Sequence, residues 1–171
     1  MKINTTYSNN IPKLVEYIGS GNWRVRWNIE EYTETRMEYE SPITGYKYEE
    51  VEFKCKPTLD EIKNVILNWF NSKIDENILS GCVWNAIPVW LSAENQFNYK
   101  AAYDLAVQTQ GGNLPVTFKF GDSMNPIYYT FNTTEDLFSF YIFCITHIQT
   151  VLEKGWKEKD SFDFSVYEKY L

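Results

Sequence analysis

The sequence has few of the residues and motifs on which most catalytic and metal sites depend. His147 is its only histidine, and no CxxC pair occurs. The GDSMN segment at 121–125 has too few carboxylates for a calcium loop. The GSGN segment at 19–22 lacks the following Lys-Ser or Lys-Thr of a phosphate-binding loop, and no GxGxxG opens a helix. We therefore expect no enzyme, and no catalytic, cofactor-binding or metal-binding residues.

Cysteine is also scarce, and a signal peptide and a transmembrane run are both lacking. The three cysteines, Cys55, Cys82 and Cys144, lie far apart in apolar runs, which is typical of buried thiols in a reducing compartment. The first residues have no apolar signal-peptide core, and the longest apolar run, 137–148, is shorter than the roughly 20 residues that cross a bilayer. We expect a protein that is cytoplasmic when synthesised and has no membrane partner.

Positive charge is in deficit, whereas aromatic residues are abundant. A net charge of -7 and a pI near 4.8 oppose attraction to phosphate backbones, so we expect no nucleic-acid partner. Aromatic residues make up 18% of the chain and must fill a core or form contact surfaces. This composition favours an assembly or recognition protein over a small enzyme.

The remaining candidates for acid–base chemistry have simpler structural interpretations. His147 lies in an apolar helical stripe with no Ser or Cys motif nearby, which favours a satisfied core histidine or a subunit contact over a catalytic base. The pairs Glu30–Glu31 and Glu49–Glu50 point to opposite faces of a strand and so do not form catalytic pairs. We expect them to form an acidic, solvent-exposed sheet face.

The hydrophobic pattern predicts an α+β protein, with an N-terminal antiparallel β-meander at 1–56 and a compact domain of three helices and short antiparallel strands at 57–171. In NWRVRWNIE (22–30), apolar and polar residues alternate as in a strand with one buried face. The segment 36–56 predicts two further strands joined by a turn at SPITG, where Pro42 and Gly45 supply the bend.

Capping and glycine signals predict the elements of the second domain. Thr58 and Glu61 form a capping box for a helix that ends near 71–73. The run CVWNAIPVWL (82–91) predicts a short hairpin or bent strand, and Ser92 is the expected N-cap of a helix to about Thr109.

Beyond that helix, two strands and a third helix are expected. The segments 114–120 and 126–131 predict strands around a turn, and the last helix should start at 132–136 and end at Gly155. We expect the aromatic tail after it to dock against this chain or a neighbour.

The stretch SAENQFNYKAAYDLA (92–106) raises the main functional question, because amides and aromatics directly follow two tryptophans. Such groups can stack on and hydrogen-bond a sugar, anchor a protein interface, or serve as core residues and helix caps. The candidate partner-binding residues are Trp84, Trp90, Glu94, Asn95, Gln96, Asn98 and Tyr99.

Residues 57–163 resemble a small domain of tail-fibre-assembly-type and other tail-associated proteins of tailed phages and prophages of gut anaerobes. The resemblance lies in KPTLDEIKNVI, SGCVWNAIPVWLSAENQFNYKAAYDLA, LPVTFKFG, a late helix and the closing GWKEKD. Ser92, Glu94, Asn95 and Gln96 match the recurring helix-start motif of that family. The family supplies no catalytic residues to carry over.

The resemblance implies a structural protein of a virion, acting through contacts with other virion proteins and forming a homo-oligomer. A fibre-like N-terminal extension is missing and the meander stands in its place, which favours an adaptor in the tail, neck or fibre attachment over a fibre tip. Two alternatives stay open: a carbohydrate-recognition module on the particle, and an intracellular assembly factor that the virion does not retain.

Overall fold

The computed structural model describes residues 2–34, 43–122 and 124–170, and these form an α+β protein as predicted. The chain divides into two compact units, which are Met1–Asn68 with Phe162–Leu171, and Trp69–Ser161. The boundary between the two units falls after Asn68, within the first helix. The division into two domains at residues 56 and 57 stays a prediction. None of the helices in the described ranges combines the length and the apolar character that a bilayer crossing requires.

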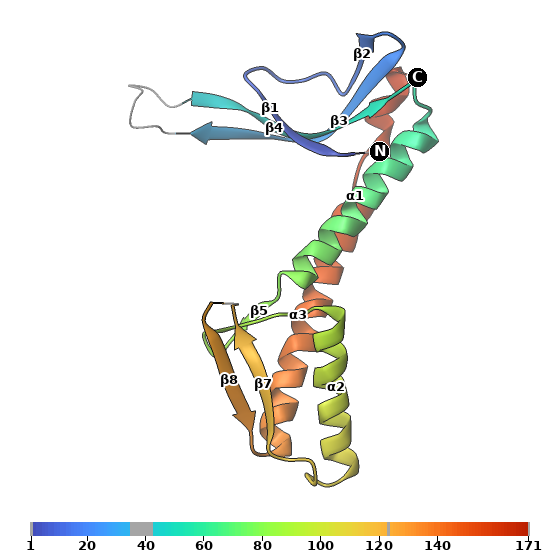
Figure 1. The fold of residues 1–171 in the computed structure, drawn as a ribbon. Helices are drawn as coiled ribbons and strands as arrows, with labels where there is room; N and C mark the ends of the chain where they lie inside the picture. The colour runs from blue at the N-terminus through green and yellow to red at the C-terminus, as the bar shows by residue number, and fades with distance from the viewer. Residues whose placement is uncertain (1, 35–42, 123, 171) are drawn as a thin grey trace. The chain divides into compact units, whose positions relative to one another are not determined.

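Unit 1 is built on a four-stranded antiparallel sheet (Figure 1). Its strands are β1 (Asn4–Ser8), β2 (Val15–Gly19), β3 (Asn22–Glu34) and β4 (Ile43–Phe53). The predicted strand at 22–30 lies within β3, and the second of the two strands predicted in 36–56 is β4, whereas β2 was not predicted as a strand. The order β1-β4-β3-β2 adds β1 beside β4, far away in sequence, which local patterning does not reveal.

The prediction that Gly45 belongs to the turn at SPITG is wrong. Gly45 lies inside β4, opposite Tyr32 of β3, and a Cβ atom there would meet the Ser8 carbonyl oxygen and the Tyr32 ring. The glycine therefore permits a close approach of neighbouring strands and does not bend the chain. Residues 36–40 and Pro42 of the predicted strand and turn lie outside the described residues.

The expected acidic, solvated sheet face is wrong at Glu49 and Glu50, which are both buried. The Nε atom of Arg26 donates to Glu50 Oε2 at 2.7 Å, and its Nη1 contacts Glu16 Oε2 at 2.9 Å. Arg26 is itself only 5% exposed, although simple alternation places it on the solvent side of β3. Its charge is buried because two carboxylates compensate it.

The C-terminal segment docks onto this unit, which confirms the expectation that the tail packs against something. A 3-10 helix, η1 (Phe164–Tyr170), buries Tyr167 completely. The Tyr167 hydroxyl donates to the backbone carbonyl of Arg26 at 2.8 Å.

Helix α1 (Leu59–Leu79) begins with the predicted capping box. The Thr58 backbone N–H and hydroxyl donate to Glu61 Oε2 at 2.8 and 2.9 Å, which lowers the pKa of Glu61. The predicted end near 71–73 is wrong, since the helix continues to Leu79. Ile74 and Ile78 extend the apolar row of Ile62, Ile66 and Phe70, so the helix has a buried side along its length.

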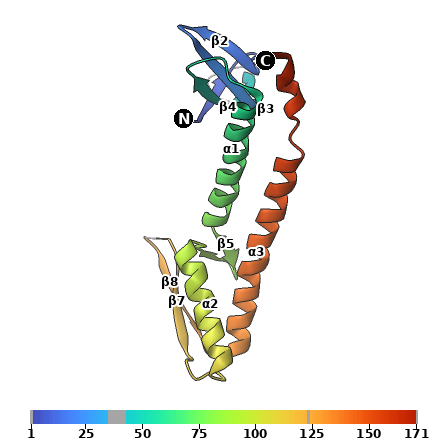
Figure 2. The same ribbon diagram turned by 90° about the vertical axis from the view of Figure 1, so that its right-hand side faces the viewer.

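Unit 2 combines two hairpins with two long helices (Figure 2). Besides the second part of α1, it contains β5 (Cys82–Trp84), β6 (Ile87–Val89), α2 (Ala93–Gln108), β7 (Val116–Gly121), β8 (Pro126–Phe131) and α3 (Thr134–Asp160). The β7–β8 hairpin runs alongside α2 and α3, and aromatic rings fill the space between them. These strands and both helix starts were predicted.

The predicted end of α3 at Gly155 is wrong. Thr133 caps its start by accepting from the Asp136 backbone N–H at 3.1 Å, but the helix passes through Gly155 to Asp160. Gly155 is buried against Ile74 of α1. Here a glycine serves close helix packing, and the sequence pattern alone does not separate that use from a helix stop.

Candidate functional site

The tight β5–β6 hairpin determines which way each candidate tryptophan points. Asn85 and Ala86 form a two-residue turn with φ values of 50° and 63°, which pairs Trp84 with Ile87 and Cys82 with Val89. Because side chains alternate along a strand, this register turns Trp84 inward and leaves Trp90, the residue after buried Val89, facing outward.

Trp84 is partly buried and packs against the aromatic core. Its ring lies 4.9 Å from the Tyr129 ring, 5.1 Å from Phe140 and 5.6 Å from Phe131, measured between centroids. Such edge-on and tilted contacts stabilise a packed aromatic core. Trp84 therefore lies on the inner side of the hairpin, whereas Trp90 is 51% exposed.

The amides at the start of α2 hold the preceding segment in place. Ser92 Oγ accepts from the Asn95 backbone N–H at 3.2 Å, as expected of an N-cap. The Gln96 Nε2 group donates to the Leu91 carbonyl oxygen at 2.6 Å. Part of this polar cluster is therefore local helix chemistry.

The backbone of Trp90 is fixed more firmly than its exposure suggests. Its carbonyl oxygen accepts two hydrogen bonds, from Asn95 Nδ2 at 3.2 Å and from the Tyr99 hydroxyl at 3.3 Å. Tyr99 is only 3% exposed, and burial raises the pKa of its phenol, so it remains a donor at neutral pH. The indole ring therefore projects from a fixed point of the chain.

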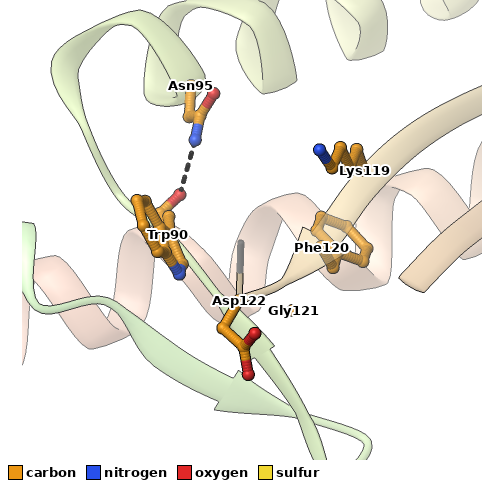
Figure 3. A pocket seen from close by; sticks show the side chains of 6 residues that line it. All are labelled: Trp90, Asn95, Lys119, Phe120, Gly121 and Asp122. Carbon is orange, nitrogen blue, oxygen red and sulfur yellow. Dashed lines mark hydrogen bonds between the residues drawn. The ribbon is translucent and has the colours of Figure 1, made fainter. Parts of the chain in front are cut away.

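A cleft of about 290 Å³ opens beside the Trp90 ring (Figure 3). Its lining comes from two separate parts of unit 2: Trp90, Asn95, Lys119, Phe120, Gly121 and Asp122. The Asp122 carboxylate accepts from the backbone N–H groups of Met124 and Asn125 at 2.7 and 2.8 Å, and the hydrogen bonds from this turn lower its pKa. One wall of the cleft thus carries a fixed negative charge.

The structure brings only part of the predicted set to the cleft. Trp90 and Asn95 line it, and the Tyr99 hydroxyl donates a hydrogen bond to the Trp90 carbonyl oxygen. Glu94 and Asn98 are exposed on α2. Lys119 and Asp122 were missed because they lie on the β7–β8 hairpin, and no spacing in the sequence links that hairpin to the start of α2.

Other chemistry-bearing side chains have structural surroundings. Cys55 is exposed, so the expectation of three buried thiols is wrong there. Cys82 and Cys144 share a side-chain hydrogen bond, and burial raises the pKa of both thiols, which makes them poor nucleophiles at neutral pH. His147 is partly buried, and its Nε2 atom makes no hydrogen bond within the described ranges, so it is not a satisfied core histidine, while the expected alternative of a subunit contact stays a prediction.

Within residues 2–34, 43–122 and 124–170, no three His, Cys, Asp or Glu side chains gather closely enough to hold a metal ion. Comparison of the chain with known protein families, curated proteins and solved structures finds no match.

Proposed function

We propose that this is a non-catalytic binding protein that holds a partner protein at the cleft beside Trp90. The observation that carries the proposal is a half-exposed tryptophan on a fixed backbone. Exposed aromatic rings are the commonest anchors of protein interfaces, and a ring that is already held in position loses little conformational entropy on binding.

The cleft also defines the chemistry that a partner would need. Trp90 and Phe120 give the cleft an apolar lining, and Lys119 and Asp122 add one positive and one negative charge at separate places around it. An interface anchor of this kind accepts an apolar side chain flanked by polar groups that match the two charges. The role in a tailed-phage virion, as an adaptor of the tail, neck or fibre attachment, rests on the sequence resemblance of residues 57–163.

The proposal is tested by the composition of purified virions. Particles from phage that carries Trp90→Ala should lose this protein, whereas particles with Trp156→Ala should keep it in a fixed ratio to the tail proteins. Trp156 is the matched control because it is the same residue type with a similar exposure, 48% against 51% for Trp90. Quantitative mass spectrometry of the particles and lysates gives the ratio.

Two results would contradict parts of this proposal. Wild-type protein that is abundant in the lysate and absent from particles would make it an intracellular assembly factor. Equal retention of the two variants would exclude Trp90 as the anchor.

The carbohydrate alternative is favoured by one observation, which is the polar lining beside the Trp90 ring. Indole faces stack on sugar rings while amide and carboxylate oxygens bind the hydroxyls. Titration with host-cell glycans, monitored by the tryptophan fluorescence of the protein, separates the two functions. Saturable quenching that Trp90→Ala abolishes would support the sugar site, and a flat titration would leave the protein partner.

A further inference from the structure

The outward side of α2 carries an uncharged ridge that no prediction from the sequence included. Ala93, Phe97, Ala101 and Leu105 follow one another at four-residue spacing, so they form one continuous row along the helix surface. All four are exposed, and Phe97 is 69% and Leu105 47% accessible to solvent. The core contacts of α2 come instead from Tyr99, Ala102, Tyr103 and Ala106.

The order of side-chain sizes along this ridge is small, large, small, large. Turning a second copy of the helix end for end sets Ala93 against Leu105 and Phe97 against Ala101 of the other copy. Each large side chain then meets an alanine, and this holds for all four contacts at once. A surface that complements itself under a two-fold rotation is what an isologous dimer requires.

We propose that the protein forms a homodimer in which the α2 ridges of two copies pack antiparallel. Rows at four-residue spacing from two helices interdigitate at a crossing angle of about −50°, the commonest class of helix packing. The alanines allow the backbones to approach, and the dimer removes Phe97 and Leu105 from water. This inference does not depend on the cleft beside Trp90.

The neighbouring row of polar residues does not oppose this pairing. Lys100 and Asp104 form an ion pair within the helix, so the flank of the ridge carries no net charge from these two residues. Gln96 and Gln108 complete the row and are neutral. The contact therefore has an apolar centre beside a polar border, as is usual in protein interfaces.

The test is sedimentation equilibrium of the full chain and of variants that change the sizes on the ridge. Wild-type protein should dimerise, and Phe97→Ala, which leaves alanine facing alanine, should weaken the dimer at least about tenfold. Ala101→Phe should weaken it similarly, because two phenylalanines would then collide. Val107→Ala is the control, since Val107 is 51% exposed on the same helix but lies off the ridge.

Mixing the two single variants provides the decisive measurement. In a mixed dimer, the two phenylalanines of the Ala101→Phe subunit each face an alanine of the Phe97→Ala subunit. The two variants together should therefore form a heterodimer of nearly wild-type affinity. Circular dichroism of each variant checks that the fold is unchanged. Three results would each overturn the proposal. They are a wild-type protein that stays monomeric at every concentration measured, a dimer whose affinity neither substitution changes, and a mixture of the two variants that forms no heterodimer.

Discussion

Gly155 of α3 lies directly against the Ile74 side chain of α1, with no space for a Cβ atom between them. A Cβ built on Gly155 would overlap both Cγ1 and Cδ1 of Ile74. Glycine lowers the stability of an isolated helix by about 1 kcal/mol relative to alanine. At this position the loss is offset by the close contact between the two helices.

Gly155→Ala should therefore destabilise the protein, although alanine favours helix formation. Overpacking of this kind costs about 1 to 3 kcal/mol, measured as the free energy of urea unfolding. Lys154→Ala, at the exposed neighbouring position, is the control and should have little effect. The double variant Gly155→Ala/Ile74→Ala should lose less than the sum of the single variants, since the second change makes room for the first. Strict additivity would refute the contact.

Tyr167→Phe should destabilise the protein by about 1 to 2 kcal/mol. The substitution removes the hydroxyl that satisfies the Arg26 carbonyl in a buried setting, and an unsatisfied buried acceptor is costly. Chemical denaturation monitored by circular dichroism gives the value. Tyr128→Phe serves as control because Tyr128 is 69% exposed, and equal effects of the two substitutions would show that the Arg26 contact contributes nothing.

Stability should fall at alkaline pH because burial raises the pKa of both Tyr99 and Tyr167. Above about pH 10, these phenols ionise in the unfolded chain but stay protonated in the folded one, so each lowers the unfolding free energy by about 1.4 kcal/mol per pH unit. Below about pH 10, the two buried phenols make their full contribution to the free energy of unfolding. Tyr99→Phe should make the slope of the unfolding free energy between pH 10 and 11 shallower, and a slope equal to that of the wild type would contradict the raised pKa.

Arg26 and Arg24 offer a comparison of a buried and an exposed ion pair. Glu50→Ala should cost about 3 kcal/mol, since it strips a buried guanidinium of its closest partner. Glu52→Ala removes the nearer of the two carboxylates that contact Arg24, the other being Glu50 at 3.7 Å, and should cost less than about 1 kcal/mol. Unfolding at low and high salt checks the assignment: the Glu52 effect should vanish in salt, and the Glu50 effect should persist.

The two candidate tryptophans should behave differently in stability measurements. Trp84→Ala empties part of the aromatic core and should lower the unfolding free energy by about 3 to 5 kcal/mol. Trp90→Ala removes an exposed ring and should change it by less than about 1 kcal/mol. A stable Trp84→Ala protein would return that residue to the list of contact candidates.

Local signals account for the parts of the fold that could be predicted. Helix starts at Thr58, Ser92 and Thr133 are fixed by side chains within three residues of the cap, so the sequence reveals them. Helix ends are less visible, because tertiary contacts extend α1 past residue 73 and allow Gly155 inside α3. The pairing of β1 with β4 and the burial of Arg26 likewise depend on residues distant in sequence.

The candidate site shows the same limit. Trp84 and Trp90 each follow a valine, so their immediate surroundings in the sequence are alike. Only the two-residue turn at Asn85 and Ala86 decides that one faces the core and the other the solvent. The contribution of Lys119 and Asp122 to the cleft requires the hairpin to lie beside α2, which no local pattern encodes.

The composition of unit 1 from two separated stretches of chain has a consequence for synthesis on the ribosome. Residues 69–161 are all translated before residue 162, so unit 2 can begin to fold while the sheet still lacks η1. Tyr167 then reaches the Arg26 carbonyl, 141 positions earlier in the chain, only after the intervening unit has emerged. A nascent chain released before residue 162 would keep the whole of unit 2, but its sheet would lack the buried Tyr167 side chain and the hydrogen bond to the Arg26 carbonyl, which would favour capture by chaperones and proteases.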